Sequence, residues 1–252
     1  MRTIEATRYV TPLREGGSLP ALVEASDDGL YVLKFRGAGH GEKALVAEVV
    51  AGELARALGL AVPELALVEL DPTLGRAEPD AEIQDLLLAS AGLNLGVDFL
   101  PGALPFNPAA ELAPDADFAA ALVWFDALVT NPDRTAQNTN LLWWHGRLHP
   151  IDHGAALYFH HALARVAEHE RGRFEQIRNH VLLPYASSIR DADARLAPLV
   201  DEPLLERVAA EIPAVWLNGD DPRMYVDYLL GRLAEPRAWV DEAEEEWTLR
   251  AR

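Results

Sequence analysis

The first seventy residues consist mostly of short stretches in which apolar and polar side chains alternate, a pattern typical of β-strands. The alternation predicts strands at residues 4–13, 21–26, 30–35 and 60–71. A glycine-rich turn separates the first two strands, and Asp28-Gly29 predicts a hairpin turn between the second and third. Apolar residues recur at helical spacing over residues 42–58 and stop at Gly59, which predicts one main helix. The pattern therefore indicates a β-meander followed by a helix and a further strand.

Residues 72–108 depart from this pattern. A short helix is predicted at 81–92, and a stretch rich in Gly, Pro and Asn follows it. This change of composition predicts a hinge at about residues 97–106, and with it an N-terminal lobe, 1–106, and a C-terminal lobe, 107–252.

The C-terminal lobe is predicted to be mainly helical. Its periodic segments cover residues 116–131, 160–177, 191–200, 202–212 and 222–247. One exception is an apolar hairpin, in which strands at Leu141–Trp144 and Leu148–Ile151 flank a turn at residues 145–147. The order of elements predicts an α+β fold with a β-rich N-lobe and a helical C-lobe.

Composition removes several classes of chemistry. The chain has 252 residues and no cysteine, which excludes thiolate catalysis, cysteine zinc sites, iron–sulfur clusters and disulfides. Half of its residues are hydrophobic, so a packed core is expected. With 22 basic and 40 acidic residues the net charge is −18, which disfavours binding to nucleic acid. No apolar run approaches the roughly 20 residues that span a bilayer, and the N-terminus lacks an export signal, so we expect no membrane partner and a cytoplasmic location.

A cluster of polar residues surrounds the predicted hairpin. Asp133 follows the helix at 116–131, Asn138 comes five residues later, and Asp152 follows the second strand. Phosphoryl transfer from ATP uses this set of groups, because one aspartate orients the nucleophile while an asparagine and a second aspartate hold Mg²⁺. Asn140 is an alternative to Asn138, since both precede the same strand.

The N-terminal lobe offers the complementary parts. Lys34 lies within an apolar strand, and Glu48 lies among apolar residues on the following helix. Each has an ordinary interpretation as a solvated side chain, but a lysine paired with a helix glutamate is also the clamp that phosphoryl transfer requires. Gly16, Gly17 and Ser18 form the turn between the first two strands, where backbone N–H groups can approach phosphates.

With these motifs in order, the sequence resembles the HipA-type kinases, within the larger protein-kinase-like and phosphoinositide-kinase-like group. The resemblance is carried by D-R-x-x-x-N at residues 133–138 and by I-D-x-G at residues 151–154, and it extends to about residue 170. It implies a two-lobed kinase-like fold and an enzyme that moves the γ-phosphate of ATP to a hydroxyl group. The acceptor stays open between a protein Ser/Thr and a small molecule.

Carried over by position, the resemblance implies a role for each matching residue. Lys34 would contact the α- and β-phosphates with Glu48 as its ion-pair partner, and Asp133 would act as catalytic base. Asn138 and Asp152 would bind Mg²⁺. Backbone groups at Leu100 to Gly102 would hydrogen-bond adenine at the hinge, and Arg134 would organise the catalytic loop by pairing with a nearby carboxylate.

The chain departs from eukaryotic protein kinases at three motifs. N-P-D stands where those enzymes have H-R-D, D-H-G stands where they have D-F-G, and no A-P-E follows. A phosphorylation-switched activation loop is therefore not expected. The main alternative is a pseudokinase or regulatory module that binds ATP without turnover.

The sequence offers two other candidate sites. Six of the eight histidines lie between His145 and His169, which allows an imidazole and carboxylate site for a transition metal, although most of these histidines are expected at the surface or as caps. A serine hydrolase would have to use Ser18 or Ser90 without the G-x-S-x-G elbow. Neither pattern competes with the kinase motifs.

Overall fold

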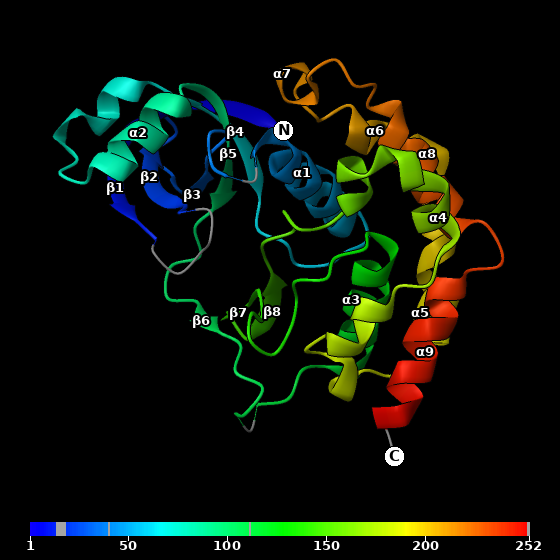
Figure 1. Ribbon diagram of the computed structural model, residues 1–252. Coiled ribbons are helices and arrows are strands. Elements are labelled where there is room, and N and C mark those ends of the chain that lie inside the picture. Colours follow the sequence, from blue (N-terminus) through cyan, green and yellow to red (C-terminus); the bar gives the residue numbers. More distant parts are fainter. Residues whose placement is uncertain (14–18, 40, 111, 251–252) are drawn as a thin grey trace. The chain divides into compact units, whose positions relative to one another are not determined.

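The computed structural model describes residues 1–13, 19–39, 41–110 and 112–250. Strands dominate the N-terminal part and helices the C-terminal part, so the predicted α+β class is confirmed (Figure 1). Contacts group the chain into two units, Met1–Val46 with Pro63–Gly102 and Ala47–Val62 with Ala103–Arg252. The boundary after Gly102 falls within residues 97–106.

The first unit is built on a closed β-barrel. Its strands, in their order around the barrel, are β1 (Arg2–Pro12), β2 (Ala21–Ala25), β3 (Leu30–Lys34), β5 (Gly92–Asp98) and β4 (Leu65–Leu70). Neighbouring strands are antiparallel except for β1 and β4, which pair in parallel and close the barrel. The predicted strands are confirmed, whereas the pairing that closes them is visible only in the structure.

Glycine permits close packing inside this barrel. A Cβ built on Gly96 of β5 would lie 2.6 Å from Val68 Cγ2 and 3.3 Å from Tyr31 Cβ, so a larger residue would force the strands apart. The buried side chains Val23, Leu33 and Val68 contribute to the apolar core of this unit. A short 3₁₀ helix (Pro72–Ala77) and α2 (Ala81–Ala89) complete the unit.

Helix α1 (Gly41–Ala57) confirms the helix predicted at 42–58. Its residues up to Val46 group with the barrel, and its residues from Ala47 group with the second unit. Gly59 follows the helix with φ +83°, the left-handed conformation that glycine adopts at helix C-termini.

The second unit contains the predicted hairpin, formed by β7 (Leu141–Trp144) and β8 (Arg147–Pro150). His145 and Gly146 both have positive φ angles at its turn, the backbone geometry of tight two-residue hairpin loops. β6 (Leu104–Pro105) adds a third strand beside β7.

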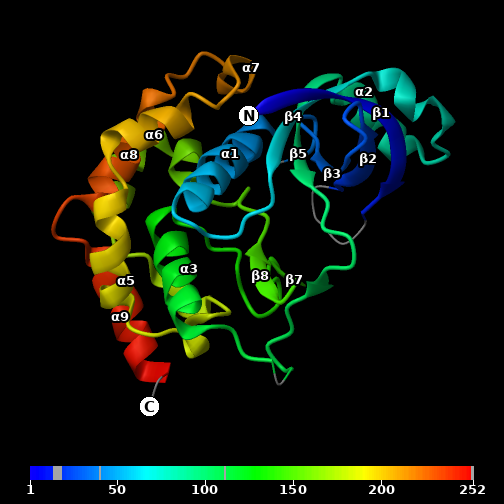
Figure 2. The same ribbon diagram turned by 180° about the vertical axis from the view of Figure 1, so that it is seen from behind.

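Helices form the rest of this unit, and both views show α3 alongside α5 and α9 (Figures 1 and 2). The helices are α3 (Ala116–Leu128), α4 (Val166–Arg171), α5 (Ile189–Leu196), α6 (Glu202–Ala209), α7 (Ala214–Leu217), α8 (Arg223–Leu233) and α9 (Ala238–Arg250). The indole Nε1 of Trp124 on α3 donates to Asp193 Oδ1 on α5 at 2.8 Å, and its ring lies 5.6 Å from that of Trp239 on α9. Among the described residues, no helix is long and apolar enough to cross a membrane.

Two predicted helices are wrong in extent. Residues 160–177 form short 3₁₀ turns around α4 instead of one helix, because α4 buries none of its residues and ends at Gly172, whose backbone is extended. Residues 222–247 form α8 and α9 as separate helices, since Pro236 lies between them and proline cannot continue a helix.

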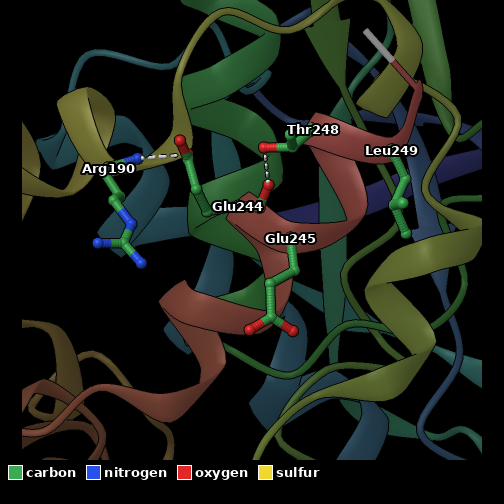
Figure 3. Close-up of a pocket in the computed structure, with 5 residues that line it drawn as sticks. All are labelled: Arg190, Glu244, Glu245, Thr248 and Leu249. Carbon is green, nitrogen blue, oxygen red and sulfur yellow. Dashed lines mark hydrogen bonds between the residues drawn. The ribbon is translucent and has the colours of Figure 1, made fainter. Parts of the chain in front are cut away.

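Helix α9 caps its neighbour α5. Glu244 Oε2 accepts hydrogen bonds from the backbone N of Ile189 and of Arg190, at 2.8 and 3.0 Å, so a carboxylate from one helix satisfies the free amides that begin another. Figure 3 shows the hydrogen bond from Arg190 to Glu244 beside a surface pocket, which Thr248 and Leu249 also line.

Candidate functional site

The loop after α3 brings Asp133 together with Asn138 and Asn140. Asp133 Oδ2 accepts a hydrogen bond from Asn138 Nδ2 at 2.8 Å and a second from Asn140 Nδ2 at 3.1 Å. The structure therefore places both asparagines that the sequence offered against the same carboxylate oxygen.

Short-range hydrogen bonds explain why this stretch forms a compact loop. Thr135 N donates to Asn138 O at 2.9 Å, and Asn138 N donates back to Thr135 Oγ1 at 3.3 Å. Asp133 N donates to Asn131 Oδ1 at 3.1 Å. Small polar side chains at these positions supply the acceptors that the turning backbone needs.

A buried ion pair anchors the loop to α3. Arg134 Nε lies 2.6 Å from Asp126 Oδ2, and the side chains of both residues have an exposed fraction of 0%. Asn131 Nδ2 donates to the other oxygen, Asp126 Oδ1, at 3.1 Å. The prediction that Arg134 pairs with a nearby carboxylate is confirmed, and the partner is Asp126 on α3.

His180 completes this buried cluster. Leu182 N donates to His180 Nδ1 at 3.1 Å, so Nε2 carries the proton and donates to Asp126 Oδ2 at 2.9 Å. Burial lowers the pKa of His180, which keeps the imidazole neutral. Burial opposes ionisation of Asp126, but the charge of Arg134 and the hydrogen bond from His180 outweigh it and hold the pKa of Asp126 below its usual range.

The same arginine connects the loop to the segment that carries Asp152. Arg134 Nη1 donates to the carbonyl oxygens of Asn140 and, at 3.1 Å, of Ile151, while Nη2 lies 3.3 Å from His153 Nδ1. Ile151 N also donates to Asn140 O at 3.0 Å. One guanidinium thus holds the backbone at Asn140, two residues after Asn138, and at Ile151, which precedes Asp152.

Asp152 itself has φ +57°, in the left-handed region that non-glycine residues seldom adopt. Such backbone strain persists only where surrounding contacts determine it, and it concentrates at functional sites. Here the contacts of Arg134 to Ile151 and His153, on either side of Asp152, supply that constraint.

Glu48 is a buried carboxylate on α1, with an exposed fraction of 2%. Its Oε1 accepts a hydrogen bond from the backbone N of Gly154 at 2.9 Å, so it contacts the D-H-G segment directly. Both residues belong to the second unit. Sequence reasoning assigned Glu48 to Lys34 and missed this contact.

The other predicted residues belong to the first unit. Lys34 ends β3, where it pairs across the sheet with Leu95. Leu100 is buried after β5, and Gly102 has φ +75° in the turn that follows. Gly16, Gly17 and Ser18 lie outside the described residues, so the glycine turn stays a prediction, as do the pairing of Lys34 with Glu48 and the adenine contact.

Sequence reasoning missed Asp126 and His180. A usable signal existed for Asp126, because it is the one carboxylate within the apolar run AALVWFDALV, and a buried charge needs a partner. His180 carries no such local signal, since it lies 54 residues from Asp126 in the chain. Most of the six clustered histidines were expected at the surface or as caps, and two of them, His153 and His160, are buried instead.

Comparisons with known proteins agree with these motifs. A family model described as HipA-like kinase matches residues 7–237 of the chain. Among solved structures, the crystal structure of a Helicobacter pylori proinflammatory kinase, CtkA, matches 99% of this chain and 100% of its own, with a TM-score of 0.55 and 15% identity. At that identity the likeness concerns the fold alone. A search of curated proteins gave no match.

Proposed function

Because this chain belongs to the HipA-like kinase family, we propose that it is a phosphotransferase that uses ATP and Mg²⁺. In this proposal the γ-phosphate passes to a hydroxyl group, either of a protein serine or threonine or of a small molecule. The family membership supports this proposal, and the structural neighbour adds a likeness of fold to a kinase.

The observation that carries the proposal is the pair of amide contacts to Asp133. A catalytic base must hold its carboxylate in one orientation so that it can accept the proton of the attacking hydroxyl. Asn138 and Asn140 both donate to Oδ2 of Asp133, and the buried Asp126–Arg134 pair anchors the same loop to α3. The second oxygen of Asp133 is then the candidate acceptor for the hydroxyl proton.

The residues present fit a magnesium ion. Mg²⁺ prefers oxygen ligands from one or two carboxylates together with substrate phosphates. The Nδ2 of Asn138 donates to Asp133, which leaves the other amide atom, Oδ1, as a candidate oxygen ligand for the metal. Asp152 supplies a carboxylate. Asn138 and Asp152 would hold the ion, which when bound neutralises charge on the transferred phosphate.

Binding of ATP falls to residues of the first unit together with Glu48. Lys34 would contact the α- and β-phosphates, and Gly16, Gly17 and Ser18 would cover them with backbone N–H groups. Leu100 and Gly102 would present backbone groups to adenine. Glu48 would pair with Lys34 through the carboxylate that also holds Gly154.

ADP release from Mg·ATP tests the proposal. Asp133→Ala should lower the turnover rate by about 10²- to 10⁴-fold, the usual contribution of a general base. Asp85→Ala, which changes an exposed carboxylate on α2, is the matched control and should behave as the wild type. Equal rates for Asp133→Ala and wild type would refute the catalytic assignment.

Thermal denaturation distinguishes an enzyme from a pseudokinase. A ligand that binds only the native state raises its melting temperature. Stabilisation of the wild type by Mg·ATP without turnover would identify a pseudokinase, and absence of stabilisation would reject the nucleotide site. Asp152→Asn should remove the magnesium dependence of that stabilisation.

A further inference from the structure

Arg232 on α8 is a buried arginine with an exposed fraction of 1%. Its guanidinium donates to four backbone carbonyls: Nη2 to Ala127 O at 2.6 Å, Nε to Leu128 O at 3.3 Å, and Nη1 to Gly172 O at 2.9 Å and His169 O at 3.1 Å. No ion pair to a carboxylate is formed by Arg232 within the described part of the chain.

Two of these carbonyls belong to the last turn of α3. The last four carbonyls of a helix lack partners within it. Here Phe125 O accepts from Val129 N and Asp126 O accepts from Asn131 N, and the remaining two, of Ala127 and Leu128, accept from Arg232. The arginine therefore closes the helix that leads directly into the catalytic loop.

The other two carbonyls lie at the C-terminal end of α4, in the segment that follows Asp152. The negative end of a helix dipole favours a cation. The C-termini of α3 and α4 therefore stabilise the buried charge of Arg232, as a carboxylate would otherwise do. The Trp239 ring, 5.1 Å from its Cζ, adds a cation–π contact. Burial lowers the pKa of Arg232 to about 10, so the side chain stays charged at neutral pH.

We infer that Arg232 is a positioning residue. By binding the C-termini of α3 and α4 at once, it holds the catalytic loop and the segment after Asp152 in fixed positions relative to each other. All of these elements belong to the second unit, and α8 contacts both α3 and α4; Figure 1 shows α4 next to α8. The inference rests on the proposed kinase function. Among the predicted ATP and magnesium ligands that the structure describes, Arg232 contacts none, so it acts through the backbone it holds.

Two substitutions distinguish the positive charge of Arg232 from the hydrogen-bond donors of its guanidinium. Arg232→Lys keeps a cation but cannot reach four carbonyls, and Arg232→Met keeps much of the aliphatic volume without charge. Both should lower kcat for ADP release by about tenfold or more, because small misplacements of catalytic groups are costly, while KM for ATP stays within about twofold. In the chain without nucleotide, amide hydrogen exchange at residues 131–140 and 166–172 should become about tenfold faster.

The controls distinguish positioning from general loss of stability. Leu229→Ala opens a cavity on the same helix and should lower the melting temperature without changing kcat below that temperature. Arg223→Met removes an exposed arginine that pairs with Glu202 and Glu206 and should leave kcat and exchange unchanged. Loss of kcat in Leu229→Ala equal to that in Arg232→Lys, at matched stability, would overturn the inference.

Hydrogen exchange keeps the inference separate from the proposed function. If the wild type releases no ADP, the kinase proposal fails. Hydrogen exchange still tests the positioning role of Arg232: unchanged exchange in Arg232→Lys would refute that role, and faster exchange would support it. Should both Arg232 variants fail to fold, Trp239→Phe serves instead, since it removes the indole face and the hydrogen bond from Nε1 to Arg232 O. Faster exchange at residues 166–172 in Trp239→Phe is then the expected result, and wild-type exchange would overturn the inference.

Discussion

Glu48 on α1 binds the backbone amide of Gly154, with 2.9 Å between Oε1 and N. The contact joins a helix to the residue two positions after Asp152, across 106 residues of sequence. Glu48 therefore has a partner in the D-H-G segment that does not depend on Lys34. A buried acceptor of this kind fixes the backbone it binds, because an unmatched buried N–H is costly.

Substitutions at Glu48 separate its two roles. Glu48→Ala leaves Gly154 N unsatisfied and should lower the free energy of unfolding by about 1–3 kcal/mol in urea denaturation. Glu48→Gln keeps an oxygen acceptor and should retain most of that stability, while ADP release falls because the charge proposed to pair with Lys34 is lost. Glu53→Gln, on the same helix, is the control for charge alone. Equal destabilisation by Glu48→Gln and Glu48→Ala would contradict the contact.

The two asparagines that contact Asp133 should differ in their effect on magnesium. Asn138→Ala should raise the Mg²⁺ concentration for half-maximal ADP release by about tenfold or more, because it removes a proposed ligand. Asn140 has φ +47°, so Asn140→Ala should mainly cost about 1–2 kcal/mol of stability, and Asn140→Gly should restore much of it. A larger magnesium shift in Asn140→Gly than in Asn138→Ala would reverse the assignment.

Removing Arg134 should be strongly destabilising. Arg134→Met leaves Asp126 charged, buried and without its cation, at an expected cost of about 3–5 kcal/mol in the free energy of unfolding. In the double variant with Asp126→Asn the cost should be clearly less than the sum of the single variants, because the unpaired charge is gone. Urea denaturation of the four proteins measures this coupling, and additive values would show that the pair does not act as a unit.

His180 should make stability depend on pH between about 5 and 8. Its pKa is lowered in the folded protein, so as pH falls below about 6.5 the unfolded chain binds a proton that the native state does not, and stability declines. Asp126 does not contribute in this range, because its lowered pKa gives stability that is present above about pH 3.9 and is lost only as pH falls further. His180→Gln keeps a donor for Asp126 without the titration.

Urea midpoints at several pH values between 5 and 8 test this prediction. The wild type should lose more stability than His180→Gln as the pH falls from 8 to 5. Parallel curves for the two proteins would show that His180 does not carry the effect.

Local patterns predicted the elements whose formation depends on neighbouring residues. The helix at 42–58, the strands that became β2 and β3, and the hairpin at 141–151 agree with the structure, because period, caps and turn chemistry act within a few residues. The prediction failed at residues 160–177, where helical spacing is present but the central part, α4, buries none of its residues. Helical propensity over so short a segment is too weak to form a continuous helix without packing.

For the candidate site, the sequence by itself predicted Asp133, Asn138 and Asp152 and determined their order, since the first two are close along the chain and a tight hairpin precedes the third. Only the tertiary structure decided what holds them: Asp126 and His180 around Arg134, and Gly154 against Glu48. These partners are separated from each other by 8 to 106 residues. Burial selects them, because a charge or polar group removed from water must find its complement wherever the fold places one, and no local pattern encodes that position.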